Sequence, residues 1–203
     1  EIAILFLSTL FGWAAPLSAI QLLWLNLLSD GAPALALGME KGDPDIMYRP
    51  PRPPDEPVIN RDMVVGVIVQ TIAITAAVLS AYWLGMTYYA GRVQGVDPLI
   101  TAKTMAFVTL VMSELLRAYT SRSERYPLFK LGVFTNKYMQ YAVGFSMALL
   151  FLVVYLPVPK VNEIFDTTPL TAEMWLAVAP LMFLPAVVAE IQKLVKFRSK
   201  RFS

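Results

Sequence analysis

Three oxygen-bearing side chains lie close together inside an apolar stretch that covers residues 18–40. Asn26, Ser29 and Asp30 are spaced i, i+3 and i+4, so on a helix they share one face. Amide, hydroxyl and carboxylate oxygens are ligands that a hard cation such as calcium prefers. A carboxylate inside an apolar span is costly and is therefore a candidate functional group. The spacing predicts a cation site centred on Asp30.

The residues that follow Asp30 predict a break in this helix. Pro33 has no N–H and clashes with the carbonyl of Ser29, while Gly31 bends at low steric cost. A broken helix at membrane depth persists only where it is buried in protein or lines a cavity. We therefore expect freed backbone carbonyls to join the side-chain ligands. The blandest alternative is a membrane scaffold in which Asp30 only forms buried hydrogen bonds.

Apolar runs recur along most of the chain, and these runs must position the site. Of the 203 residues 57% are hydrophobic, and the mean hydropathy is +0.56. This composition predicts an all-α, polytopic helical bundle in a membrane. The expected spans, of which the first is partial, are 1–11, 16–39, 63–90, 104–117, 138–156 and 174–190. The sequence has no cysteine or histidine, which excludes disulfides and the usual zinc ligands.

Basic residues are distributed unevenly between the connecting segments. Fourteen of the 17 Lys and Arg residues fall in 40–62, 117–137 and 193–201, which lie on one side of the predicted bundle. By the positive-inside rule, these segments and the C-terminus are expected in the cytoplasm of an integral, multi-pass membrane protein. The lipid bilayer is the first predicted partner. A net charge of only +2 gives no support to nucleic-acid binding.

The stretch around Asp30 resembles a known family. It reads QLLWLNLLSDGAPALALG and is followed by DPDIMYRPPR. Together these motifs resemble the sixth transmembrane segment and the next cytoplasmic loop of P-type calcium-transporting ATPases of the sarcoplasmic- and endoplasmic-reticulum kind. The resemblance covers segments five (in part) to ten, over essentially residues 1–203. It implies that Asn26, Ser29 and Asp30 ligate calcium, although Ser29 stands where that family has Thr.

Two more acidic residues join the site through this resemblance. Glu1 aligns with a calcium-ligating Glu of the fifth segment, and Glu114 aligns with the eighth-segment Glu of the first calcium site. From the residues alone, Glu1 could be interfacial, and Glu114 could form an i, i+3 ion pair with Arg117. Such a pair would weaken or replace the first calcium site. Clustered carboxylates should take up protons when the cation leaves, consistent with the calcium–proton countertransport that the resemblance implies.

The resemblance also indicates what this sequence lacks. It contains no DKTGT phosphorylation motif and no Gly-rich phosphate loop, so this chain alone should not hydrolyse ATP. The resemblance places ATP and magnesium in cytoplasmic domains of a missing N-terminal half, whose phosphorylation domain would face the proline-rich loop 40–62. The alternatives are the same fold moving manganese or sodium and potassium, or a non-ATPase channel or secondary transporter with a broken helix. Asn26 favours calcium, because sodium–potassium pumps have Asp there.

Overall fold

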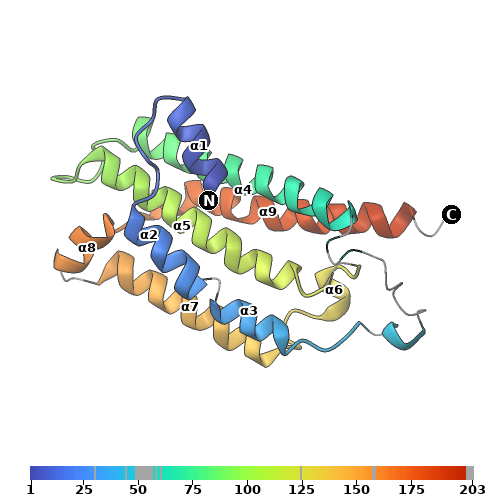
Figure 1. The fold of residues 1–203 in the computed structure, drawn as a ribbon. Coiled ribbons are helices and arrows are strands. Elements are labelled where there is room, and N and C mark those ends of the chain that lie inside the picture. The colour runs from blue at the N-terminus through green and yellow to red at the C-terminus, as the bar shows by residue number, and fades with distance from the viewer. Residues whose placement is uncertain are drawn as a thin grey trace.

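The computed structural model describes residues 1–29, 31–43, 45–48, 57, 59, 61–123, 125–156 and 159–199, which form helices joined by short loops (Figure 1). The helical elements are α1 (Ile2–Leu10), α2 (Ala19–Trp24), a π-helical turn (Leu25–Ser29), α3 (Gly31–Gly38), a 3-10 turn (Ile46–Tyr48), α4 (Arg61–Thr87), α5 (Pro98–Thr120), α6 (Leu128–Leu131), α7 (Lys137–Tyr155), α8 (Pro159–Phe165) and α9 (Ala172–Ser199). No strand occurs in the described ranges. The predicted all-α fold is confirmed.

Five helical stretches are long and apolar enough to cross a membrane. They are Ala19–Gly38, Met63–Thr87, Pro98–Thr120, Lys137–Tyr155 and Ala172–Val195. Their number matches the five complete spans expected from the sequence, so the protein is a polytopic helical bundle. By contrast, α1 has nine residues and is too short to cross the hydrocarbon core alone.

The helix α5 is longer than the span predicted for it at 104–117. Asp97 caps its N-terminus by accepting a hydrogen bond from the Leu99 N–H at 2.8 Å, and Pro98 supplies a fixed φ at the first turn. The helix therefore includes Lys103, which lies just before the predicted span. Its ammonium is accommodated by an ion pair with Asp166 at 2.9 Å.

The centre of the bundle is α5. Its apolar window is 67% buried, compared with 22% for that of α9. The helices α4 and α9 pack on it and on each other, while α7 packs on it beside α3 (Figure 1). Close approach of α4 depends on Gly85, since a Cβ there would lie 2.5 Å from the Ala102 Cα. Small residues at this crossing are typical of helix packing in membranes.

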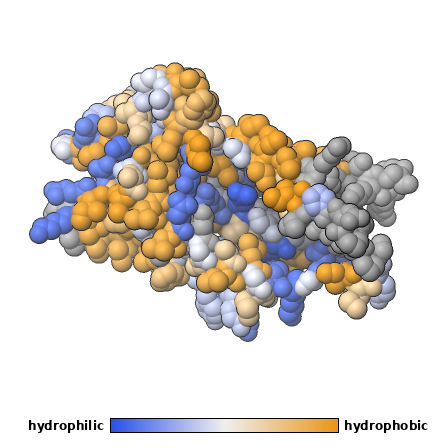
Figure 2. Space-filling model, viewed as in Figure 1, coloured by the Kyte–Doolittle hydropathy of each residue, from blue (hydrophilic) through white to orange (hydrophobic). Residues whose placement is uncertain are grey.

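Hydrophobic side chains also cover much of the outer surface. Figure 2 shows them over the visible faces of α1 and α4. Ile2, Ile72, Tyr141 and Leu176, which lie on four different helices, are each more than 60% exposed. Such extensive apolar exposure is unusual for a water-soluble monomer and suits contact with lipid. The protein is therefore an integral, multi-pass membrane protein.

Candidate cation site

The predicted break in the second helical stretch is a π-helical turn. Ser18 begins the stretch with a capping box, in which its hydroxyl accepts from the Gln21 N–H and the Gln21 side chain accepts from the Ser18 N–H. Regular α-helix ends at Trp24, and Leu25–Ser29 forms the π-turn. Pro33 falls within the first turn of α3, where an N–H has no partner inside the helix. Single π-turns inside helices occur often at functional sites.

The structure brings two of the predicted ligands together at this turn. The Asn26 Nδ2 donates a hydrogen bond to the Glu1 Oε2 at 3.2 Å, and it also donates to the Leu22 carbonyl at 3.0 Å. Glu1 precedes α1, so the contact joins two helical elements that are separated by 25 residues. Because the amide nitrogen makes both bonds, the Asn26 Oδ1 is the atom that a cation would meet.

The structure describes the remaining predicted ligands only in part. The Ser29 backbone closes the π-turn, while Asp30 and the Ser29 side chain lie outside the described residues. Glu114 is half-buried on α5, with its Oε2 shielded from solvent, and α5 packs against the π-turn and α3. In the described part of the chain, no three acidic residues are close enough to hold a metal ion. The structure thus joins Glu1 to Asn26 and leaves the other ligands as predictions.

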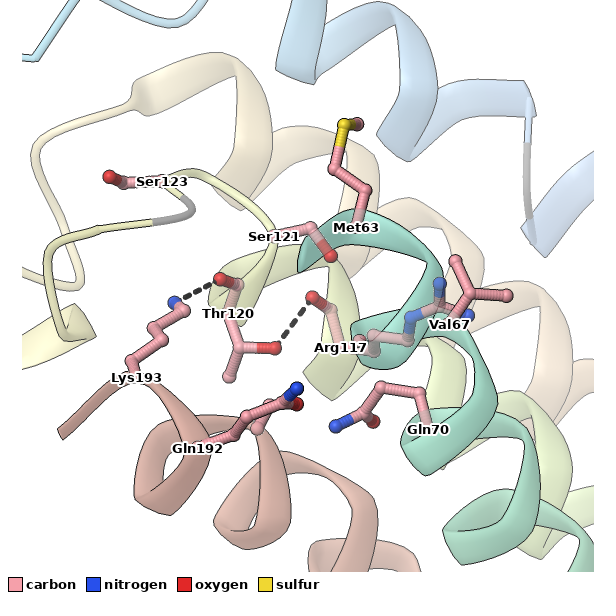
Figure 3. Close-up of a pocket in the computed structure, with 11 residues that line it drawn as sticks. Met63, Val67, Gln70, Arg117, Thr120, Ser121, Ser123, Gln192 and Lys193 are labelled. Atoms are coloured by element: carbon pink, nitrogen blue, oxygen red, sulfur yellow. Dashed lines mark hydrogen bonds between the residues drawn. The ribbon is translucent and has the colours of Figure 1, made fainter. Parts of the chain in front are cut away.

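Arg117 does not form the ion pair with Glu114 that we considered. In the described ranges its guanidinium makes no ion pair, and it lines a cavity of about 300 Å³ between α4, α5 and α9 (Figure 3). The cavity also contains Gln70 from α4 and Gln192 from α9, whose side chains point toward one another. The geometry therefore gives no support to the idea that Arg117 weakens a calcium site by pairing with Glu114.

A buried cluster that the sequence did not reveal fixes the end of α3. The Arg122 Nε and Nη2 donate to the two carboxylate oxygens of Glu40, each at 2.8 Å. The same guanidinium donates to the Gly132 carbonyl at 2.8 Å and to the Thr135 hydroxyl at 2.6 Å. Asn136 adds a hydrogen bond to the Glu40 Oε2 at 2.7 Å. We call Arg122, Glu40 and Asn136 the Arg122 clamp.

The Arg122 clamp ties α3 to the loop that connects α5 and α7. Asn136 also donates to the Ala36 carbonyl at 3.1 Å, so it holds the last turn of α3 directly. The Arg122 side chain is 1% exposed. Its hydrogen bonds to Glu40 lower the pKa of that carboxyl from its usual 4.5, against an opposing effect of burial. Arg122 and Asn136 are 82 and 96 positions from Glu40 in the sequence, and no local sequence pattern indicates that they meet.

Polar contacts also fix α2, at the opposite side of the π-turn. The buried Gln21 side chain donates to the Phe165 carbonyl at the end of α8, at 2.8 Å. Asp166 follows with φ at +50° and pairs with Lys103 of α5. The two half-helices on either side of the π-turn are therefore anchored to different parts of the bundle.

Comparisons with known proteins agree with this architecture. Residues 14–195 match the family described as "Cation transporting ATPase, C-terminus". The chain is 37% identical over 205 residues to calcium-transporting ATPase 1 of Bacillus cereus, covering 97% of this chain and 23% of that protein. It is 36% identical over 156 residues to calcium-transporting ATPase 1 of Schizosaccharomyces pombe, covering 76% and 16%.

A further relative is calcium-transporting ATPase type 2C member 1 of Homo sapiens, which is 31% identical over 192 residues and is matched over 94% of this chain and 20% of its own length. The chain thus spans between 16% and 23% of the length of these three relatives. The family match extends from the loop before α2 into α9 and so includes all five membrane-capable helices. The chain therefore belongs to the C-terminal domain family of P-type cation-transporting ATPases.

Proposed function

We propose that this chain is the ion-translocating C-terminal part of an ATP-driven calcium pump. The observation that carries the proposal is the contact between Glu1 and Asn26, which places a carboxylate from one helical element beside the π-turn of another. Family membership supports a cation pump, and the relatives described above are named calcium-transporting. Calcium is the transported substrate in this proposal and moves out of the cytosol.

The proposed ligands are oxygen atoms gathered around the π-turn. Asn26 contributes its amide oxygen, Ser29 its hydroxyl or carbonyl, and Asp30 the central carboxylate. Glu1, which precedes α1, adds a carboxylate through its contact with Asn26, and Glu114 adds one from α5, which packs against the π-turn. These side-chain oxygens are close in number to the six to eight oxygens that calcium takes, and backbone carbonyls of the π-turn would complete the set.

Release of calcium should be coupled to proton uptake in this site. Three carboxylates held close together cannot all remain ionised in a poorly solvated region without a cation. When calcium leaves, protons replace part of its charge, and when calcium returns the protons are displaced. This exchange is the physical basis for calcium–proton countertransport.

The energy source must come from parts of the pump outside this chain. ATP and magnesium belong to cytoplasmic domains of the N-terminal half, and loop 40–62 would contact the phosphorylation domain. The concentration of Lys and Arg in 40–62, 117–137 and 193–201 supports a cytoplasmic position for that loop and for the C-terminus. The Arg122 clamp joins the start of this loop to the rest of the bundle, which would help to transmit movement to α3.

The test is calcium-dependent ATP hydrolysis by the complete pump in wild type and Asp30→Asn. We expect calcium-stimulated turnover in the wild type and its loss in the variant. Asp97→Asn is the matched control, because Asn also caps helices and Asp97 lies at the far end of α5. Turnover that is stimulated instead by manganese, or by sodium and potassium, would mean that the pump transports that cation and not calcium. Turnover that is indifferent to Asp30→Asn would refute the proposed site.

A further inference from the structure

A cavity at the basic end of the bundle is separate from the proposed cation site. It lies between the start of α4, the end of α5 and the C-terminal part of α9, and its volume of about 300 Å³ is at the lower end of the range for ligand pockets (Figure 3). Arg117, in its wall, is three residues from the end of α5. At 1.5 Å per residue this places Arg117 about 4.5 Å from the helix end, near the level of lipid headgroups.

The charge of the cavity lining is positive. Among the described residues, its lining includes Arg117 and Lys193 and no Asp or Glu. Lys193 is already neutralised, because its ammonium lies 3.0 Å from the Glu190 Oε1 and also donates to the Thr120 carbonyl. Arg117 makes no ion pair in the described part of the chain. A half-buried guanidinium without a carboxylate is a site for an external anion, and its fork matches phosphate oxygens.

The remaining lining is suited to a ligand with a polar head and an apolar tail. Gln70, Gln192 and Ser121 contribute amide and hydroxyl groups to the lining of the same cavity as Arg117. Val67 lines the same cavity and is 54% exposed, so the cavity wall continues into an apolar helix surface. Further exposed hydrophobic side chains lie next to the lining residues on α4 and α9, namely Val64, Ile68, Val187 and Ile191.

We propose that this cavity binds the phosphate of one anionic phospholipid, with Arg117 as its principal ligand and the acyl chains along α4 and α9. The negative charge of such lipids complements the Arg117 guanidinium, and basic pockets between transmembrane helices recognise anionic headgroups in this way. The lipid would bridge α4 and α9 at the same end as the Arg122 clamp. This inference depends only on the membrane fold and does not depend on which cation the pump transports.

The test is lipid binding to the complete pump, purified in detergent and titrated with phosphatidylglycerol or phosphatidylcholine under native mass spectrometry. We expect about tenfold tighter retention of phosphatidylglycerol, a preference that Arg117→Gln abolishes and Arg117→Lys keeps in part. Arg125→Gln is the matched control, since Arg125 is exposed at the same end and does not line the cavity. Equal loss in Arg117→Gln and Arg125→Gln would overturn the proposal, because the preference would then be a general surface effect.

A variant that fills the cavity provides an independent test. A Cβ at Gly66 would meet only the Gln192 Nε2, at 3.8 Å, so Gly66→Leu should fill the cavity without disturbing the backbone. We expect it to weaken retention of phosphatidylglycerol at least as much as Arg117→Gln does. Undiminished retention would place the lipid elsewhere and overturn the assignment.

Two further outcomes would assign the cavity to another occupant. Displacement of the lipid by soluble glycerol phosphate at an equal concentration would show a free-phosphate site and refute the lipid. A photoreactive benzophenone amino acid at Val67 should form a lipid adduct. A cross-link to a peptide of the same pump would instead show that a protein segment fills the cavity. Both measurements are made without calcium or ATP, so failure of the transport proposal does not affect them.

Discussion

Replacement of Arg122 by methionine should destabilise the protein by about 3–5 kcal/mol, the usual effect of breaking a buried ion pair. The guanidinium is 1% exposed and bonds both carboxylate oxygens of Glu40, the Thr135 hydroxyl and backbone carbonyls. Methionine replaces the aliphatic part of the Arg122 side chain but supplies none of its hydrogen-bond donors. The Glu40 carboxylate, 15% exposed, would then keep only Asn136 as a side-chain donor among the described residues.

A double replacement separates the ion pair from general packing. Arg122→Met combined with Glu40→Leu removes both charges, so the buried carboxylate no longer lacks its partner. We expect the double variant to recover about 2 kcal/mol relative to the sum of the single variants, because apolar replacement of a buried pair is close to neutral. The matched control is Arg92→Met. Arg92 pairs with Glu173 at 3.2 Å, but the side chains are 48% and 69% exposed, so the change should be at most about 1 kcal/mol.

The assay is the free energy of unfolding of the complete protein in mixed micelles, followed by tryptophan fluorescence over a denaturant titration. If Arg122→Met costs no more than Arg92→Met, the Arg122 clamp is not a buried ion pair in solution and the reasoning fails. It also fails if the double variant is as unstable as the sum of its single changes, since that would show that the two charges are not coupled.

Three further changes have defined outcomes. Because hydrogen bonds from Arg122 lower the pKa of Glu40 below 4.5, the stability that this carboxylate contributes to the wild type should be complete above about pH 4.5. It should shrink as the pH falls through the folded-state pKa, in unfolding titrations from about pH 7 to pH 3. Gly85→Val should lower the thermal unfolding midpoint, since a Cβ would lie 2.5 Å from the Ala102 Cα; an unchanged midpoint would contradict this packing. Glu1→Gln keeps a hydrogen-bond acceptor but removes a charge, so the calcium concentration for half-maximal ATP hydrolysis should rise about tenfold, equivalent to about 1.4 kcal/mol; no shift would remove Glu1 from the ligands.

The periodic and compositional features of the sequence were sufficient to predict the bundle. Five apolar stretches became the five membrane-capable helices because length and hydropathy decide which segments can cross a bilayer. Gly31 and Pro33 predicted an interruption beside Asp30, and the structure has an irregular turn just before these two residues, which themselves lie in α3. The form of the interruption, a π-turn over Leu25–Ser29, was not predicted, since it depends on how α2 and α3 pack against the other helices.

Contacts between distant residues could not be predicted in the same way. Glu40 and Arg122 are ordinary loop charges in the sequence, and only the fold places them in bidentate contact. The span predicted at 104–117 excludes Lys103 because charged residues usually end a span, but its pairing with Asp166 makes it compatible with helix α5. Arg117 was considered against Glu114 because local spacing favours such pairs, whereas the structure directs it into a cavity between three helices.

The anchoring of the two half-helices has a mechanical consequence. Gln21 fixes α2 to the end of α8, while Glu40 and Asn136 fix the end of α3 to the loop before α7. With both outer ends held, the segment between them cannot slide or tilt as one rod without breaking buried hydrogen bonds. Any rotation between α2 and α3 would then be taken up in the π-turn, which is the segment that separates the two anchored half-helices. The residues that we propose as cation ligands would therefore also form the pivot that transmits cation binding to the rest of the bundle.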